Sequence, residues 1–216
     1  MKRIISGIIV FVAGLFAPQI LQAQGTIYVS NLGASAGSMA VGSNSWLSAG
    51  FATGFNADGY ELNSVQLAMT DASGNPNGFT VMLYNQGQPT AIRPGSSLGT
   101  LDGSTDPATT GIYTYTPASN ITLSPNTYYF IVLTAGTAVA NGAYEWNEST
   151  SHSVNGGWGE LNGIGHSSDG LSWGGGTTSN YPQFAINVTD IPESGVLGLF
   201  ALGGLCFLRH RRKARV

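Results

Sequence analysis

Positively charged residues are almost absent from the middle of this sequence. Of its 8 Lys and Arg residues, two stand at positions 2 and 3 and five between 209 and 215, which leaves Arg93 for everything between. The stretch 24–191 holds that one cation against ten acids, a formal charge of −9. Binding of nucleic acid depends on several Lys and Arg contacts to phosphate, so this composition excludes it.

Cysteine is nearly absent as well. The one thiol, Cys206, lies in an apolar segment near the C-terminus, so no disulfide can form within the chain. Lys and Glu, which favour helices, are scarce in the middle of the sequence, whereas Gly, Ser, Thr, Asn, Tyr and Val are common. This composition favours turns and strands. The length of 216 residues allows one domain or at most two small ones.

The N-terminus has the layout of a secretory signal peptide. Lys2 and Arg3 precede an apolar run over 4–17, which a proline and then the small residue Ala23 follow. We expect cleavage between Ala23 and Gln24, and the mature protein on the far side of the membrane. The alternative is an uncleaved anchor helix, but the run is shorter than the ~20 apolar residues that normally span a bilayer.

The C-terminus is predicted to be a short transmembrane helix. The apolar run 195–208 would form a helix of about 21 Å, which is shorter than a hydrocarbon core of ~30 Å. Basic side chains follow it at once and can extend to the headgroups on the cytoplasmic side; these are Arg209, Arg211, Arg212, Lys213 and Arg215. No polar stripe interrupts the run, which argues against an amphipathic or core helix.

This tail resembles the PEP-CTERM sorting signal, which consists of a Pro-Glu-Pro motif, a short transmembrane helix and an arginine-rich end. Pro192, Glu193 and Ser194 stand at the motif, with serine in place of the second proline. The resemblance implies that a transpeptidase-like exosortase of the membrane processes a transient inner-membrane anchor. It also implies a Gram-negative envelope, a final location at the cell surface or outside the cell, and a link to exopolysaccharide.

Between these ends, apolar and polar residues alternate with the period of β-strands. The stretches 65–69 and 79–83 alternate clearly, and the turn-forming residues 71–78 between them predict an antiparallel hairpin with a long loop. The apolar run 128–133 predicts a central strand covered on both faces. Further strands are expected at 27–30, 47–52, 112–116, 128–134, 143–147 and 183–188.

About eight short strands punctuated by Gly, Pro and Asn predict an all-β fold, specifically a jelly-roll-like β-sandwich. An N-terminal signal helix and a C-terminal transmembrane helix would flank it. The expected organisation is a signal peptide over 1–23, a surface domain over 24–190 and a sorting and anchor segment over 191–216. No fixed internal period supports a solenoid.

The body resembles the choice-of-anchor R domain over nearly its whole length. The segments that carry the resemblance are SVQLAMTDASGNPNGFTVMLYN at 64–85, PGSSLGTLDGSTDP at 94–107, YTYTPASNITLSPNTYYFIVLTA at 113–135, AYEWNEST at 143–150, SSDGLSW at 167–173 and YPQFAINVT at 181–189. This family combines a common surface domain with varied C-terminal anchors. It has no established activity to transfer to this chain.

Catalytic chemistry has few candidates. Glycoside hydrolysis needs two carboxyl groups at a fixed separation, which directs attention to Glu145, Glu148, Glu160 and Asp169. Glu145 alternates with Tyr144 and Trp146 and is expected on the face opposite these aromatic residues. Solvated acids are ordinary on a secreted β-domain, so we assign no catalytic residue and expect no enzyme. A hydrolase acting through Glu145 or Glu160 stays as an alternative.

Metal sites are weakly indicated. His152, His166 and Asp169 are the residue types that bind zinc, but they lie in a loop that fixes no geometry. Oxygen-bearing side chains at alternate positions also resemble a calcium loop, namely Asp71, Ser73, Asn75 and Asn77. Met82 stands where a calcium loop of the EF-hand type has its bidentate Glu, so a turn is the stronger interpretation. No metal and no cofactor is expected.

Trp158 and Trp173 are the candidate glycan contacts. Both lie in a loop-rich stretch, 151–180, where no alternation predicts their burial. Exposed aromatic rings stack on sugars, and the formal charge of −9 favours neutral glycans. The alternative is that both rings fold back and cap one end of the sandwich.

These observations favour a non-enzymatic protein of the cell envelope or extracellular matrix. It is expected to be exported, held by its C-terminal helix, processed by an exosortase-like enzyme and associated with exopolysaccharide. A carbohydrate-binding module that uses the loop tryptophans is the first alternative, and a secreted glycan hydrolase is the second.

Overall fold

The computed structural model describes residues 25–88, 91–103, 105–151, 153–161, 163–176 and 180–193. The predicted signal peptide and its cleavage site between Ala23 and Gln24 lie outside the described residues, as does the predicted apolar helix 195–208. Within the described ranges, no helix is long and apolar enough to cross a membrane.

The described chain is all-β, with one short 3-10 turn at Val139–Asn141. The longer strands are β1 (Thr26–Ser30), β2 (Gly37–Val41), β3 (Trp46–Ala52), β4 (Tyr60–Gly74), β5 (Thr80–Gln88), β6 (Ala91–Gly103), β7 (Gly111–Pro117), β9 (Tyr128–Thr134), β10 (Gly142–Ser149) and β16 (Phe184–Asp190). Shorter strands are β8 (Thr122–Leu123), β11 (Ser153–Val154), β12 (Gly159–Glu160), β13 (Ile164–Ser167), β14 (Gly174–Gly176) and β15 (Tyr181–Pro182).

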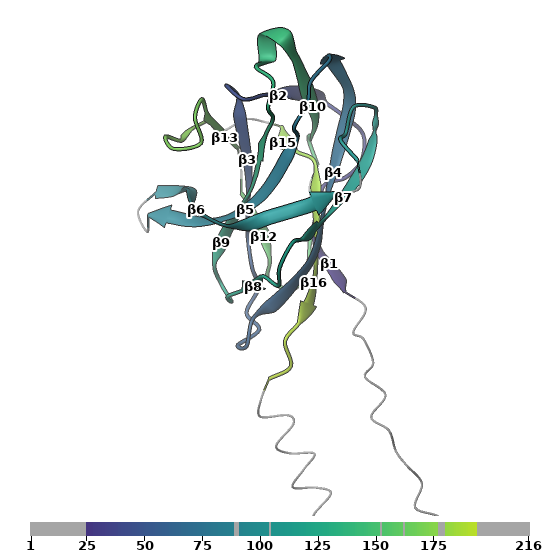
Figure 1. The fold of residues 1–216 in the computed structure, drawn as a ribbon. Coiled ribbons are helices and arrows are strands. Elements are labelled where there is room, and N and C mark those ends of the chain that lie inside the picture. The colour runs from purple at the N-terminus through teal and green to yellow at the C-terminus, as the bar shows by residue number, and fades with distance from the viewer. Residues whose placement is uncertain are drawn as a thin grey trace, which may run out of the picture.

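Antiparallel pairing joins these strands into a sheet that curls on itself (Figure 1). Its main path runs β11-β1-β16-β4-β7-β6-β5-β9-β3-β13-β14, and β10 joins it through β4 while also pairing with β2 and β15. The curled sheet brings the inner faces of its strands together. The all-β prediction is therefore confirmed.

The central strand was predicted correctly. β9 pairs with β5 on one side and with β3 on the other, and all its residues after Tyr128 are buried. Tyr129, Ile131 and Leu133 point into the main core, whereas Phe130 and Val132 belong to a second, smaller apolar cluster. Both faces of this strand are covered because successive side chains point in opposite directions.

The main core fills the space inside the curled sheet. Its largest fully buried side chains include Trp146 and Tyr144 of β10, Phe51 of β3, and Phe184 of β16. The indole N–H of Trp146 donates to the Gln183 carbonyl at 2.9 Å, so this polar atom is satisfied inside the core.

The predicted hairpin between residues 65–69 and 79–83 is wrong. Both segments are strands, but β4 pairs with β16, β7, β10 and β8, whereas β5 pairs with β6 and β9. The linking residues were also misassigned in part, because β4 continues to Gly74. The turn that follows carries the chain from one part of the curled sheet to another instead of folding it back on its neighbour.

The hairpin of β5 and β6 extends beyond the body. Past Asn85, β5 pairs only with β6, through Gln86 and Pro94 and through Gln88 and Ala91. We call this outer part, residues 86–88 and 91–95, the arm. Figure 1 shows β6 and β5 projecting to one side of the molecule.

Both ends of the described chain lie at the same end of the body. β1 runs antiparallel to β16, with Thr26 opposite Val188, so the start of one strand lies beside the end of the other (Figure 1). The phenol of Tyr28 donates to the Asp190 carboxylate at 2.9 Å. Desolvation and this hydrogen bond raise the pKa of Tyr28 to about 12, so the phenol stays a donor at neutral pH.

Candidate functional site

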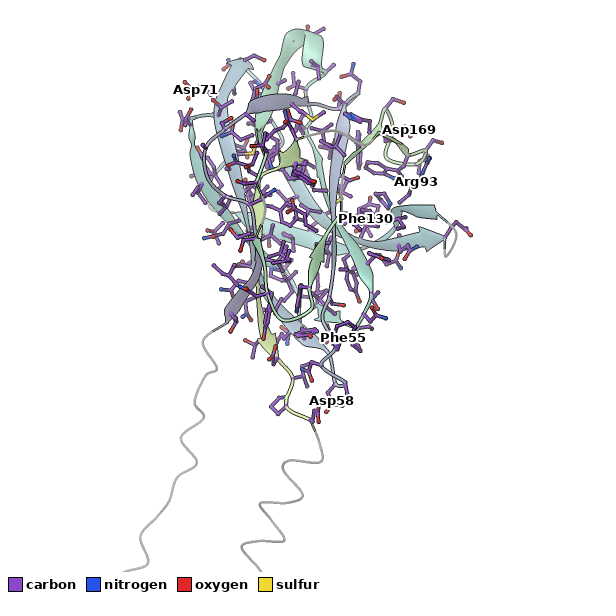
Figure 2. The ribbon with its side chains drawn as sticks, turned by 180° about the vertical axis from the view of Figure 1, so that it is seen from behind. Phe55, Asp58, Asp71, Arg93, Phe130 and Asp169 are labelled. Carbon is purple, nitrogen blue, oxygen red and sulfur yellow. The ribbon has the colours of Figure 1, made fainter. Side chains whose placement is uncertain are left out.

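A cleft of about 370 Å³ lies between the arm and the outer face of β3, β9 and β13. We call it the arm cleft. Its lining comes from the arm, from the outer face of the sheet and from the segment 161–175; the residues are Ser48, Gly50, Ile92, Arg93, Pro94, Phe130, Leu161, Gly163, Ile164, Gly165, Gly174 and Gly175. Figure 2 shows Arg93, Phe130 and Asp169 on this side of the body, where the arm leaves it.

The alternation of β3 creates the floor of the arm cleft. Leu47, Ala49 and Phe51 are buried in the main core, so Ser48 and Gly50 face outward toward the cleft. A Cβ at Gly50 would lie 2.4 Å from Leu161 Cδ1 and 2.9 Å from a Phe130 ring carbon. Glycine is therefore required here for the close packing of Phe130 and Leu161.

Gly165 makes a second close approach at this floor. β13 pairs with β3 so that Gly165 lies opposite Ser48, and a Cβ at residue 165 would lie 2.2 Å from Ser48 Oγ. The side-chain-free backbone of β13 can therefore pass directly over the serine hydroxyl. The backbone of this glycine thereby becomes part of the lining.

Ser48 is the unusual polar residue of the arm cleft. Its side chain is only 2% exposed, and its Oγ has no hydrogen-bond partner among the described residues. A buried hydroxyl without a partner costs about 1–3 kcal/mol relative to a satisfied one. Ser48 lines the cleft, so a bound molecule that shifts Gly165 slightly could supply the missing partner.

Arg93 lies at the rim of the arm cleft and is exposed. Its Nη1 donates to the backbone carbonyl of Trp173, which ties the arm to the segment that carries Gly174 and Gly175. Within the described ranges no carboxylate pairs with it, although ten acids share the stretch 24–191 with this one cation. Its remaining N–H donors stay directed to solvent or to a ligand.

The second apolar cluster supports the cleft from beneath. Tyr84, Phe130, Val132 and Trp173 are its buried members, and Trp46, Met82, Tyr128 and Leu161 pack against them partly buried. Burial raises the pKa of Tyr84, so this phenol stays neutral. The cleft therefore rests on packed aromatic and aliphatic side chains.

Both candidate glycan contacts are buried. Trp158 is 4% exposed, and its ring stacks nearly parallel on Tyr28 and Phe51, at centroid distances of 5.1 and 6.0 Å, and meets Tyr60 edge-on at 4.8 Å. Trp173 is 8% exposed within the second cluster. The two rings therefore lie in different apolar clusters, and neither presents the open ring face that stacking on a sugar needs.

The candidate acids are spread over different elements. Glu145 lies between the buried Tyr144 and Trp146 of β10, on the opposite face as predicted, and accepts a hydrogen bond from the Ser38 hydroxyl at 3.0 Å. Glu148 is half-buried on the same strand. Asp169 is exposed, and hydrogen bonds from the Leu171 and Ser172 amides and the Ser167 hydroxyl lower its pKa.

Glu160 has the most unusual environment of these acids. Desolvation raises its pKa to about 8, so the carboxyl group is mostly protonated at neutral pH. Its Oε1 accepts a hydrogen bond from Asn31 Nδ2 at 2.6 Å, and its buried Oε2 has no partner among the described residues. Glu160 does not line the arm cleft, whose described lining contains no carboxylate.

The candidate metal ligands are engaged elsewhere. Asp71 and Ser73 belong to β4. The Asp71 carboxylate accepts hydrogen bonds from the Thr110 amide and hydroxyl at 2.7 and 2.9 Å. These hydrogen bonds lower the pKa of Asp71. Asn77 Oδ1 accepts from the Thr137 hydroxyl at 3.1 Å. His152 lies outside the described residues. Among the described residues, no three His, Cys, Asp or Glu side chains gather as a metal site would need.

His166 stands on β13 beside the arm cleft without being part of its lining. Desolvation lowers the pKa of His166, and the nearby Glu148 carboxylate opposes that shift. Its imidazole is therefore mostly neutral at neutral pH.

Only part of the sorting motif is described. Pro192 and Glu193 are exposed, and Ser194 and the basic tail from Arg209 to Arg215 lie outside the described residues. The chain just before the motif is held by the body, because the Ile191 amide donates to the Gly59 carbonyl at 3.1 Å and Asn56 Nδ2 donates to the Ile191 carbonyl at 3.0 Å.

Sequence reasoning did not find the arm cleft. Arg93 was noticed as the single cation of the body but not as part of a site, and Ser48 carried no signal because serine is common here. The stretch 151–180 was interpreted as loop-rich, whereas Ile164–Ser167 and Gly174–Gly176 within it are strands. The pairing of β13 with β3, which brings Gly165 over Ser48, is a long-range contact that no local pattern reveals.

No protein-family model, no curated protein and no solved structure matches the chain.

Proposed function

We propose that this is a non-enzymatic exported protein of the cell envelope or extracellular matrix, sorted through its C-terminal tail and associated with exopolysaccharide. Its body would be a jelly-roll-like β-sandwich of the choice-of-anchor R type. A signal helix would precede it, and a transmembrane helix would follow it. An exosortase-like enzyme would then process the tail.

The observation that carries this proposal is the position of the two chain ends. The first residues of β1 lie beside the last residues of β16, so the segments that precede and follow the body attach at one end of it. A domain tethered in this way can extend its opposite end away from a membrane. The hydrogen bonds that fix Ile191 to Asn56 and Gly59 hold the base of the tail against the body.

The arm cleft supports a binding role for the body. Its described lining consists of five glycines, Arg93, Ser48 and apolar residues, a combination of few polar groups and apolar surface that suits noncovalent binding. A hydrolase acting through Glu145 or Glu160 is the other candidate, since a carboxylic acid with a raised pKa can act as a general acid. Turnover of a polysaccharide by the purified protein would support the hydrolase and contradict a non-enzymatic role.

Removal of the tail tests the anchoring directly. A chain that ends at Glu193 should leave the membrane fraction and appear in the medium or periplasm, because the apolar helix and its basic end are gone. A matched variant with Arg209, Arg211, Arg212, Lys213 and Arg215 replaced by Gln should still be exported but be retained less efficiently. If the truncated protein stays in the envelope to the same extent as the full chain, the proposal is wrong.

A further inference from the structure

We propose that the arm cleft binds a carboxylate-bearing sugar residue of a polysaccharide, with Arg93 pairing with the carboxylate and Ser48 with a hydroxyl group of the sugar. This inference rests on the proposed association with exopolysaccharide and names the kind of sugar involved.

Arg93 lacks a carboxylate partner, which indicates that the ligand of the arm cleft carries a negatively charged group. If this single cation served stability alone, one of the ten acids of 24–191 would be expected to pair with it, yet its partner in the described residues is a backbone carbonyl. The guanidinium has five N–H donors in a planar fork that fits a carboxylate with two parallel hydrogen bonds. The described lining of the arm cleft contains no carboxylate that could compete for it.

The overall negative charge of the body does not prevent this pairing. The formal charge of −9 is distributed over many elements, and salt screens exposed charges beyond about 8 Å at physiological ionic strength. Glu160, which precedes the lining residue Leu161, has a pKa raised to about 8 and is mostly uncharged at neutral pH. Asp169 already accepts hydrogen bonds from Leu171, Ser172 and Ser167 with Oδ1. The attraction between the ligand carboxylate and Arg93 is therefore stronger than its repulsion by the distant acids. The prediction of neutral glycans was based on the net charge alone.

Ser48 supplies an independent argument for a ligand with hydroxyl groups. Ser48 lines the arm cleft, and its buried Oγ, next to Gly165, has no hydrogen-bond partner in the described part of the chain. A sugar hydroxyl can both donate to and accept from this atom, which would remove the cost of leaving it unsatisfied. A simple carboxylate such as acetate offers no such group.

The composition of the lining also fits a sugar ring. A sugar presents hydroxyl groups at its edge and C–H groups on its face, and the cleft offers the Arg93 guanidinium beside the accessible apolar side chains of Ile92 and Leu161. A volume of about 370 Å³ lies at the small end of the usual range for ligand pockets, of about 300–1,000 Å³. This size suits one sugar residue inside the cleft, with the neighbouring sugars of the polysaccharide outside it.

Calorimetric titration of the full chain in detergent with trigalacturonate tests the proposal. We expect saturable binding, and binding of the neutral trisaccharide galactotriose at least about tenfold weaker, because the charge-assisted pair is lost. Acetate should bind at least about tenfold more weakly than trigalacturonate, because it leaves Ser48 unsatisfied. Raising the salt concentration should weaken trigalacturonate binding.

Four variants identify the residues. Arg93→Gln should lower the affinity for trigalacturonate by about tenfold or more, and Arg93→Lys should lower it less, because the charge remains without the fork. Ser48→Ala should lower the affinity by about threefold to tenfold without lowering the unfolding midpoint, since the hydroxyl has no protein partner. Ser64→Ala, a half-buried serine on β4 away from the cleft, should change neither quantity.

Three outcomes would overturn the inference: no binding of trigalacturonate, equal binding of galactotriose, or unchanged affinity in both Arg93→Gln and Ser48→Ala. Each of these outcomes can be distinguished from a failure of the proposed function. A protein that reaches the cell surface but binds no uronate contradicts the sugar assignment alone, whereas a protein that stays in the cytosol contradicts the proposed function whatever the calorimetry shows.

Discussion

At the scale of single residues, burial changes the acid–base behaviour of Glu160. The carboxyl group is held by Asn31 on one oxygen and is otherwise desolvated, which raises its pKa from 4.5 to about 8. The folded protein therefore keeps a proton that the unfolded chain releases between these pH values. By linkage, the stability that depends on this group is fully present below about pH 4.5 and decreases as the pH rises toward 8.

Glu160→Gln should remove this pH dependence. Glutamine keeps the shape and can still accept from Asn31, but it carries no charge, so at pH 8 the variant should be more stable than the wild type by about 1–3 kcal/mol after allowance for partial exposure to solvent. Near pH 5 the two proteins should unfold alike. Denaturant unfolding at a series of pH values measures the difference, with Glu145→Gln as the matched control. If the free energy of unfolding of Glu160→Gln changed with pH as steeply as that of the wild type, the burial argument would be contradicted.

The close approach of Gly165 to Ser48 gives a second test at this scale. Gly165→Ala should lower the free energy of unfolding by about 1–3 kcal/mol, because its Cβ would overlap with Ser48 Oγ. Adding Ser48→Ala should restore most of this loss, because the next nearest atoms are 3.4 Å or more away. Gly174→Ala, whose Cβ would have no atom nearer than 3.7 Å, serves as the control. Additive losses in the double variant would show that the serine hydroxyl is not the cause.

At the scale of elements, strands with one buried face could be predicted from the sequence. β16 is an example, since Phe184, Ile186 and Val188 lie in the main core as their alternation indicated. β6 could not be found in this way. Most of its residues are exposed, with Pro94 and Leu101 the buried ones among those described, so it carries no apolar pattern.

Strand pairing could not be predicted either. The residues between β4 and β5 are typical of a hairpin, but the two strands pair with different neighbours because the burial of the whole core decides the register and the partner. The same limit applies to the arm cleft. Arg93, Ser48 and Gly165 come from three distant segments, and only the folded sheet brings them together.

Trp158 immediately precedes β12, a short strand that pairs with β3, and its ring lies in the main core. Its ring packs on Tyr28, Phe51 and Tyr60, so Trp158→Ala should lower the free energy of unfolding by about 3–5 kcal/mol. Trp158→Phe should cost less, because it keeps an aromatic ring and the indole N–H has no partner in the described chain.

Chemical denaturation of both Trp158 variants measures these effects. Leu171→Ala is the control, since that side chain is 85% exposed and its loss should change stability by less than about 0.5 kcal/mol. If Trp158→Ala left stability unchanged and abolished glycan binding, the ring would be a ligand contact and not a cap.

At the scale of the whole molecule, the body and the two terminal segments differ sharply in charge. The stretch 24–191 has a formal charge of −9, whereas the cations are concentrated beyond it at both ends. The sheet topology attaches both ends of the body at one place, beside the paired ends of β1 and β16. Under the proposed function, retention at a membrane and contact with polysaccharide would therefore belong to different parts of one chain.

The intact mass of the protein recovered from the cell surface tests the central claim most directly. The account predicts a mature chain that begins at Gln24 and, after processing by the exosortase-like enzyme, a mass that no longer includes the apolar helix and its basic end. Surface protein with the full mass of 22.4 kDa that still begins at Met1 would contradict it.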